Sequence, residues 1–317
     1  MTLTRTDHDG TLVEATDLLN VELPDRRWAD ESHLRWLYHE NPFGDGFYGF
    51  RRTGERVDAH YAVIPQQYRT ADGPMRMVFS LNAVTRSVAQ RQGMFWSIAE
   101  EIYARCAEEY GAQGIIGVTN ENSTPPVVKR LGFRLLGPLP VRVIPAALLH
   151  PATGAEHWCV DRDFLESERF AEVTAGLDHP VDWGWRNRPT TEYLRWRLGA
   201  PNIDPFHLHR TDDLVAISVR SHFGPVPAAV IVKLIPRDDL HGRRLDAGPM
   251  IGAIGRYHGA PMAVYAGFNA RARVRGIRPP RRLQPAPLNL IYRGLTDRAP
   301  QHGFRLDTFE FLDMDAY

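Results

Sequence analysis

The chain has 317 residues, 43% of them hydrophobic and 24% charged, and its formal net charge is zero. A chain of this length can bury a sizeable core and suits two domains. Zero net charge argues against a general nucleic-acid-binding protein, and no run of about eighteen apolar residues predicts a membrane span. The N-terminus has no apolar signal run, so we expect a cytoplasmic protein. Two cysteines, Cys106 and Cys159, make no disulfide framework, and the 13 histidines show no metal-binding spacing, so we expect no metal.

The first part of the chain reads as a short strand and two helices. Thr2–Thr6 is predicted to be the strand, and apolar residues between Leu12 and Leu19 indicate the first helix. The second helix is predicted from Ser32 to Tyr38, and it should end before Asn41-Pro42, because the residue before a proline disfavours helical backbone.

A β-hairpin is expected next. Phe47–Arg52 and Val57–Val63 have strand-like composition, and Thr53-Gly54-Glu55 between them is a turn signal. Tyr68–Met75 reads as a turn-rich link to the following strand. That strand, Val78–Val84, should place Ser80 and Asn82 on one face and Phe79, Leu81 and Ala83 on the other. The face with Ser80 and Asn82 would border a cleft or face solvent.

A glycine-containing turn, Gln90-Arg91-Gln92-Gly93-Met94, precedes a helix whose apolar residues recur from Met94 to Cys106. The first N–H groups of a helix have no partner within it, and the helix dipole favours an anion there. Gly93 lets a ligand approach the backbone closely, and Arg91 adds a cation. The sequence therefore predicts a phosphate-binding turn.

A second buried strand, Gly114–Thr119, is predicted to end at Asn120. Asn122 or Ser123 is expected to cap a short helix with prolines in its first turn. That helix should stop at Gly132, before a strand that begins at Phe133.

This order of elements resembles the core of the GCN5-related N-acetyltransferase (GNAT) superfamily over some fifty residues. The matching motifs are the Gln90–Phe95 turn, the strand ending near Asn120 and the closing Leu131-Gly132-Phe133. The resemblance implies an α/β (α+β) fold with a mixed central sheet flanked by helices. It also implies that acetyl-CoA, or another acyl-CoA, is bound by residues of the turn, the strand edge and the following loop: Ala83, Val84, Thr85, Gln90, Arg91, Gln92, Gly93, Met94, Phe95, Asn120, Asn122 and Ser123. Two positions depart from the family: Phe95 stands where the motif has glycine or alanine, which would narrow or redirect the turn, and Val128 stands where many members have tyrosine.

The second half of the chain repeats features of the first in the same order. Leu34-Arg35-Trp36 recurs as Leu194-Arg195-Trp196, and Ile115–Asn120 is paralleled by Ala263–Asn269. We therefore predict two tandem GNAT-like lobes. Between Lys233 and Ala263 we find no long amphipathic helix behind a glutamine–glycine turn, so the second lobe is expected to be degenerate.

The predicted organisation is an acyl-CoA-binding domain over residues 1–148, a linker over 149–160 and the degenerate domain over 161–317. Val141–Ile144 is expected to be the last strand of the first lobe, and the chain from Asp307 alternates as a strand does.

The resemblance implies transfer of an acyl group, most simply acetyl, from acyl-CoA to an amine of a small molecule by a monomer or homodimer. His39 and Glu40, at the end of the second helix, and Asn82 are the candidate catalytic residues. Asn82 can only order a water, so the base stays open among His39, Glu40 and His60. The alternatives are a module that binds acyl-CoA without catalysis, and a transferase whose donor is bound to a carrier or to transfer RNA.

One further cluster has two interpretations. Arginines between Arg271 and Arg282 suit a phosphate or carboxylate of the acceptor, or a solvated loop with a few ion pairs.

Overall fold

The computed structural model describes residues 8–23, 30–90, 92–180, 184–237, 243–280, 287–299 and 301–314. The predicted strand Thr2–Thr6 and the candidate cofactor contact Arg91 lie outside these ranges.

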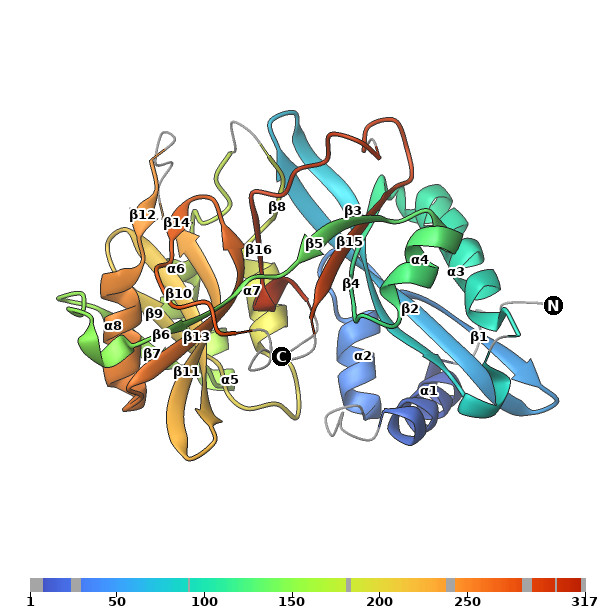
Figure 1. Cartoon of the computed structure of the whole chain (residues 1–317), viewed down its shortest axis with the longest axis horizontal. Helices are drawn as coiled ribbons and strands as arrows, with labels where there is room; N and C mark the ends of the chain where they lie inside the picture. Colours follow the sequence, from blue (N-terminus) through green and yellow to red (C-terminus); the bar gives the residue numbers. More distant parts are fainter. Residues whose placement is uncertain are drawn as a thin grey trace.

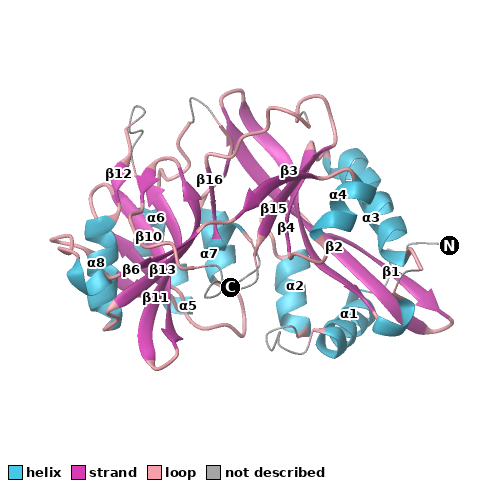
Figure 2. Ribbon diagram, in the orientation of Figure 1, coloured by secondary structure: helices cyan, strands magenta, loops and turns pink. Residues whose placement is uncertain are grey.

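The chain forms two lobes, each built on a mixed sheet (Figures 1 and 2). In lobe 1 the strands lie in the order β1-β2-β3-β4-β15-β5, and β8 pairs with β2. In lobe 2 the order is β16-β13-β11-β10-β9-β7, and β6 pairs with β13.

Lobe 1 contains most of the elements predicted for the first half. They are α1 (His8–Glu22), α2 (Glu31–His39), β1 (Phe47–Thr53), β2 (Arg56–Thr70), β3 (Gly73–Thr85), α3 (Met94–Arg105), β4 (Gly114–Thr119), α4 (Thr124–Leu131) and β5 (Arg134–Pro138), completed by β8 (Arg186–Asn187) and β15 (Asn289–Gly294). A 3-10 turn, Ser87–Ala89, precedes α3, and a π-helical turn, Cys106–Tyr110, follows it. The prediction that Tyr68–Met75 is a turn-rich link was wrong. β2 and β3 pair as far as Thr70 and Gly73, so this segment lengthens the hairpin.

The sheet of lobe 1 is covered on both faces because its strands carry apolar side chains on both. Helices α1 and α2 pack on the face that carries Phe79 and Leu81. Helix α3 packs on the other face through Ile98 and Ile102, against Tyr61 of β2. The predicted apolar stripe of α3 is therefore core, as expected of an amphipathic helix.

Lobe 2 has the same plan. It contains β6 (Val141–Ile144), β7 (Glu156–Cys159), α5 (Arg162–Glu166), α6 (Glu168–Thr174), α7 (Thr191–Leu198), β9 (His207–Arg210), β10 (Leu214–Phe223), β11 (Val226–Pro236), α8 (Gly248–His258), β13 (Met262–Asn269) and β16 (Thr308–Glu310), with β12 (Leu245–Asp246) paired to β14 (Ala272–Arg273). Short 3-10 turns are formed by Ala146–Leu148 and Phe311–Asp313.

The expectation of no long amphipathic helix behind a glutamine–glycine turn between Lys233 and Ala263 was right about the turn, since no glutamine occurs there, but wrong about the helix. Helix α8 is there, and it packs on β10, β11 and β13 through Met250, Ile251 and Ile254. Its sequence hides this role because Gly252 and Gly255 weaken the helical pattern. Both glycines are needed for packing: a Cβ on Gly255 would lie 2.6 Å from the Cβ of Ala146.

The two lobes exchange a strand. β6 pairs antiparallel with β13 of lobe 2, so its assignment as the last strand of lobe 1 was wrong. In return, β15 from the C-terminal part of the chain lies between β4 and β5 of lobe 1. The colours of Figure 1 show this directly, with green β6 among the orange strands and red β15 among the cyan and green ones. The predicted boundaries 1–148, 149–160 and 161–317 remain predictions, but hydrogen bonding crosses them in both directions.

Helices α2 and α7 meet between the lobes through the repeated leucine–arginine–tryptophan motif. The Trp36 indole N–H donates to the Trp196 carbonyl at 2.8 Å, and the Trp196 indole N–H donates to the Trp36 carbonyl at 3.0 Å. The two rings stack with their centroids 4.9 Å apart. This reciprocal contact is the arrangement expected of two related units that face each other, and it supports the predicted duplication.

Replacing Trp36 by Phe is expected to lower the free energy of unfolding by about 1–3 kcal/mol, because a buried indole hydrogen bond to the Trp196 carbonyl and part of the ring stack are lost. Trp196→Phe should remove the matching hydrogen bond to the Trp36 carbonyl, with a similar loss. The double variant is expected to lose less than the sum of the two, since either change alone disturbs the shared stack. Urea unfolding of the four proteins measures this coupling, and strictly additive losses would contradict it.

Candidate active site

The two central strands of lobe 1, β3 and β4, diverge near the middle of the sheet. β3 and β4 pair in parallel only from Val78 and Ile115 to Ser80 and Gly117. Beyond that point β3 continues to Thr85, bonded to β2 alone, while β4 continues to Thr119, bonded to β15. Among the described residues, no strand pairs with β3 beyond Ser80 on the side of β4. The opening thus exposes strand backbone that a ligand can bond. Of the three predicted pantetheine contacts, Ala83 is exposed, Thr85 is half-buried and Val84 is buried.

A β-bulge lies in this part of β3. Asn82 has a left-handed backbone, with φ of 49°, and the pairing with β2 skips a residue between His60 and Ala62. The bulge changes which face the side chains occupy. Ser80 accepts a hydrogen bond from the Tyr61 hydroxyl on the α3 face, whereas Asn82 bonds to Tyr38 of α2 on the other face. The prediction that Ser80 and Asn82 share a face was therefore wrong.

The predicted phosphate-binding turn is the start of α3. Gly93 is left-handed, with φ of 79°, and its carbonyl accepts the first N–H bonds of the helix, from Trp96 and Ser97. Among the described residues, no group accepts from the backbone N–H groups of Met94 and Phe95. Gln92 is exposed, and Gln90 is the exposed residue that ends the preceding 3-10 turn. Donors at a helix start with this backbone shape are suited to an oxyanion.

The bulky Phe95 does not block this turn from inside. Its ring packs edge to face against Tyr61, at a centroid distance of 5.2 Å, and joins the core under α3. The side chain thus faces the sheet, which leaves the backbone N–H groups as the feature that the turn offers a ligand.

The loop after β4 is held by the side chain of Asn120. The Asn120 side chain accepts from the backbone N–H groups of Asn122 and Ser123 at 3.0 and 2.9 Å. Ser123 is the N-cap residue of α4, but its hydroxyl does not bond the helix N–H groups, and Asn122 is exposed. Ser123 therefore occupies the predicted N-cap position without capping the helix through its side chain, and the Asx turn of Asn120 binds the N–H groups of Asn122 and Ser123, which precede the helix.

A buried hydrogen-bond chain connects β3, α2 and β2. The Asn82 amide donates to the Tyr38 hydroxyl at 2.8 Å, and that hydroxyl lies 3.0 Å from Nε2 of His60. Nδ1 of His60 lies 3.3 Å from the Gly49 carbonyl. A proton on Nδ1 would be donated to that carbonyl, and Nε2 would then accept from Tyr38. Burial lowers the pKa of His60 to about 4, so the ring is neutral near pH 7.

Two of the three candidate catalytic residues lie near one another. Next to Tyr38, His39 is half-buried, with Nε2 3.5 Å from the Tyr48 hydroxyl and Nδ1 4.0 Å from Asp45. The Tyr48 ring stacks on Tyr38, at a centroid distance of 5.1 Å. His39 and Asn82 are therefore joined through the two tyrosines.

Glu40 lies elsewhere: it is exposed and lines a shallow depression of about 310 Å³ with Trp36 and Trp196, between the lobes. Tyr38 and Tyr48 were not singled out from the sequence. The aromatic run Phe47-Tyr48-Gly49-Phe50 of β1 was the available signal, since alternate residues of a strand share a face.

Comparison with known proteins decides the fold. No protein-family model and no curated protein matches the sequence. Among solved structures, the chain is similar to a GCN5-related N-acetyltransferase from Kribbella flavida, at TM-score 0.62 and 12% identity, covering 93% of this chain and 71% of that one. A GCN5-related N-acetyltransferase from Anabaena variabilis gives 0.61 and 10%, covering 93% and 73%, and Eis1 from Mycobacterium abscessus gives 0.54 and 12%, covering 88% and 66%. The chain has the GCN5-related N-acetyltransferase fold.

In lobe 2 the central strands β11 and β13 also diverge, but in this half of the GNAT fold the opening between them is filled. β11 and β13 pair in parallel as far as Ile231 and Tyr265. Just beyond, β16 pairs with β13 from Gly267 to Asn269. The Glu310 side chain reaches both diverging strands, accepting from the Tyr265 hydroxyl at 2.9 Å and from the Leu234 N–H at 3.5 Å. We call residues 308–314 the C-terminal plug.

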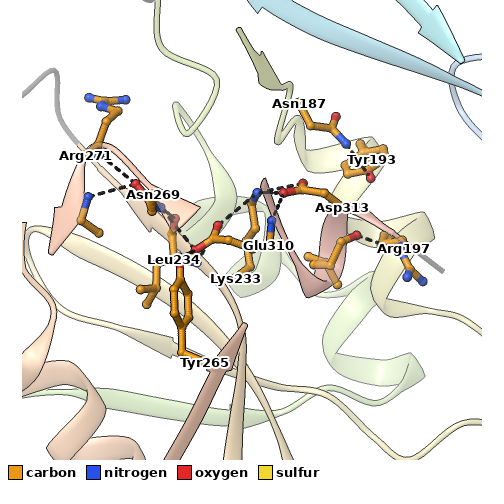
Figure 3. Close-up of polar contacts among 12 residues, drawn as sticks. Asn187, Tyr193, Arg197, Lys233, Leu234, Tyr265, Asn269, Arg271, Glu310 and Asp313 are labelled. Carbon is orange, nitrogen blue, oxygen red and sulfur yellow. Dashed lines mark hydrogen bonds and ion pairs between the residues drawn. The ribbon is translucent and has the colours of Figure 1, made fainter. Parts of the chain in front are cut away.

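A buried ionic cluster holds the C-terminal plug in place (Figure 3). Nζ of Lys233 lies 2.6 Å from Asp313 and 3.2 Å from Glu310, and all three side chains are buried. Burial raises the pKa of Glu310 to about 7, against the opposing effect of Lys233. Arg197 of α7 donates to the carbonyls of Leu312 and Met314. The plug is thus bonded from several sides, and among the described residues of lobe 2 it occupies the place where β11 and β13 diverge.

A second buried polar cluster lies in lobe 2. The Ser218 hydroxyl lies between Nε2 of His209 and Nε2 of His258, at 2.7 and 2.8 Å, and Nδ1 of His209 is 2.7 Å from Nδ1 of His157. Burial, with help from neighbouring histidines, lowers the pKa of His258 to about 4 and the pKa of His209 well below its ordinary value. Within the described ranges, no three or more His, Cys, Asp and Glu side chains could hold a metal ion. In the same ranges, no helix is long and apolar enough to cross a membrane.

Lowering the pH is expected to reduce the stability of lobe 2 through protonation of His258. Between pH 6.5 and about 4 the unfolded chain binds a proton that the folded chain excludes, so stability falls as the pH falls through this window. His258→Gln, which can keep a bond to Ser218, should reduce the loss between pH 7.5 and pH 5 by about 2 kcal/mol. Urea unfolding at the two pH values measures this. His150→Gln, at an exposed histidine, is the control, and an equal loss in both variants would contradict the assignment.

Proposed function

We propose that lobe 1 binds acyl-CoA, most simply acetyl-CoA, and transfers the acyl group to an amine of a small molecule. The observation that carries the proposal is the opening between β3 and β4 together with the free N–H groups at the start of α3. Because lobe 2 has the same strands but fills its opening with the C-terminal plug, the proposal assigns donor binding to lobe 1 alone.

In this proposal the backbone supplies most of the donor site. The N–H groups of Met94 and Phe95 bind the pyrophosphate, and residues 83–85 of β3 bond the pantetheine arm. A backbone N–H in the same stretch polarises the thioester carbonyl, so that negative charge developing on its oxygen is stabilised. The thioester is already activated, and the remaining task of the protein is to place the amine and remove its proton.

We assign His39 as the base. It is half-buried, so an acceptor can reach it, and Asp45 and Tyr48 lie beside its two ring nitrogens. His60 is fully buried and bonded at both nitrogens, which suits a positioning role. Asn82 has no basic group, and its bond to Tyr38 gives it the same role. The His39 ring lies edge to face with the Tyr48 ring, which stacks on Tyr38, so amines with an apolar portion are the expected acceptors.

His39→Gln is expected to lower kcat about 100-fold, because a general base contributes about that much to proton transfer. The affinity for acetyl-CoA should stay the same, since the proposed donor contacts are on β3 and α3. Transfer rates across pH, with acetyl-CoA binding measured by calorimetry, separate the two effects. His150→Gln should behave as the wild type, and an unchanged kcat in His39→Gln would remove His39 from the mechanism.

The proposal as a whole is tested by release of free coenzyme A thiol from acetyl-CoA in the presence of a panel of amines. Thiol release that depends on an amine supports the transferase. Tight acetyl-CoA binding without turnover on any amine would favour the non-catalytic module, for which Val128 in place of the family tyrosine speaks. No acetyl-CoA binding would overturn the donor assignment and direct attention to donors held on a carrier or on transfer RNA.

A further inference from the structure

Lobe 2 contains a pocket that the proposed acyl transfer does not use. Its volume is about 380 Å³, and it lies at the C-terminal end of β13, beside β14 and the segment before β16. Its lining includes Arg142, Arg244, Arg273, Arg305 and Asp307, together with Tyr265 and Asn269 of β13. The volume is near the lower end of the range for small-molecule sites, about 300–1,000 Å³.

The lining is strongly cationic. Four arginines face one carboxylate, Asp307. For Arg142, Arg244 and Arg273, no carboxylate of the described residues lies within ion-pair distance. The neighbouring Arg275, outside the pocket, does have such a partner, in Asp246 at 3.6 Å. Guanidinium groups gathered from β6, β14 and the start of β12 repel one another unless an anion lies between them.

Asp307 is the second observation. Its side chain is 3% exposed, and its Oδ1 is buried without a hydrogen-bond partner in the described chain. An unmet acceptor in a pocket wall is costly unless a water or a ligand donates to it. Burial raises the pKa of Asp307, and the nearby Arg186 and Arg271 act in the opposite direction. The pocket thus offers cations for an anionic group and one acceptor for a neutral donor.

Two residues connect this pocket with the C-terminal plug. Tyr265 and Asn269 line it and also bond Glu310 of the plug, and all three residues are labelled in Figure 3. We call Tyr265 and Asn269 the floor of the pocket, and it is preformed because both side chains are already hydrogen-bonded in the buried cluster. A preformed floor lowers the ordering penalty of binding.

We propose that this pocket binds a small phosphate monoester that carries hydroxyl groups, of the size of a hexose phosphate. The phosphate would lie among Arg142, Arg244 and Arg273, which offer the planar, forked donors that suit phosphate oxygens. A ligand hydroxyl would donate to Oδ1 of Asp307. The site is separate from the donor opening of lobe 1, and the proposal does not depend on acyl transfer.

The test is calorimetric titration with glucose 6-phosphate, inorganic phosphate, glucose and citrate at physiological salt. It is made on the Gly93→Glu protein, so that phosphate binding at the start of α3 does not contribute. We expect glucose 6-phosphate to bind most tightly, inorganic phosphate at least tenfold more weakly and glucose not at all. No binding of either phosphate would overturn the site, and citrate binding more tightly than glucose 6-phosphate would overturn the ligand class. Equal affinities for the two phosphates would overturn the role of the hydroxyl.

Variants assign the binding to the pocket. Arg142→Gln and, independently, Arg273→Gln are each expected to weaken glucose 6-phosphate binding at least tenfold. Arg273 is exposed, so that change should leave folding intact, and circular dichroism checks both proteins. Asp307→Asn should reduce the preference for glucose 6-phosphate over inorganic phosphate, because an amide oxygen accepts a hydrogen bond from the ligand hydroxyl less strongly than a carboxylate does. Arg275→Gln, just outside the pocket, is the matched control and should bind as the parent does. Wild-type-like binding in both Arg142→Gln and Arg273→Gln would overturn the proposal.

Discussion

Gly93→Glu is expected to weaken acetyl-CoA binding about 100-fold or more. Gly93 has φ of 79°, a conformation that side chains rarely adopt, so the glutamate strains the turn that presents the N–H groups of Met94 and Phe95. The new carboxylate also lies beside the proposed pyrophosphate site, and juxtaposed like charges cost several kcal/mol. Calorimetric titration of acetyl-CoA into both proteins measures the change.

The control for this prediction is Gly54→Glu at the tip of the β1–β2 hairpin. Gly54 is also left-handed, with φ of 62°, and a Cβ there meets no atom within 4 Å. The same strain and the same charge are thus introduced away from α3. Both variants should lose similar stability, but only Gly93→Glu should lose binding. Normal acetyl-CoA affinity in a folded Gly93→Glu protein would overturn the assignment of the phosphate-binding turn.

Lys233→Met is expected to be among the most destabilising single changes in the chain, at about 3–5 kcal/mol. The methionine fills a similar volume, but Glu310 and Asp313 then remain buried next to each other without a cation. The C-terminal plug should loosen first, because its bonds to β11 pass through these side chains. Urea unfolding gives the loss of stability, and hydrogen exchange shows whether residues 308–314 open separately.

The loss of stability caused by Lys233→Met should depend on pH. The folded-state pKa of Glu310 is raised above its unfolded value, so the folded chain binds the proton more tightly and its stability falls as the pH rises from 4.5 to about 7. Removing the lysine raises that pKa further, and the variant should therefore lose more stability at pH 8 than at pH 6. Lys129→Met, at the only other lysine, is exposed on α4 and serves as the control. Equal losses at the two pH values would argue against an uncompensated carboxylate.

The order of elements around the proposed donor site could be predicted because it depends on local chemistry. A left-handed glycine before an amphipathic helix and an apolar run that ends in asparagine are features of short segments. The sequence motif therefore located α3, β4 and α4 of lobe 1.

The bulge at Asn82 could not be predicted in this way. Period-two alternation assumes regular pairing, and the extra residue moves every later side chain of β3 to the other face. This is why Asn82 bonds Tyr38 in the acceptor region, while the alternation placed it with Ser80.

The strand exchange and the C-terminal plug escaped prediction for a different reason. Val141–Ile144 looks like any edge strand, and its partner is decided by tertiary packing more than a hundred residues away, against Ala263–Ala266. The residues from Asp307 onward show strand alternation, but no local signal says that they fill the opening of lobe 2.

The strand exchange between the lobes has a consequence for the order in which the protein can fold during synthesis. The partner of Thr119 in the lobe 1 sheet is Asn289, which lies 170 residues later in the chain. At about 10 residues per second, the ribosome needs on the order of 20 s to make that interval. Until then the β4 edge of the nascent N-terminal half has no partner, and unpaired strand edges promote aggregation. The donor site therefore matures last, although its residues are made first, and the first half expressed alone should need the second half supplied in trans.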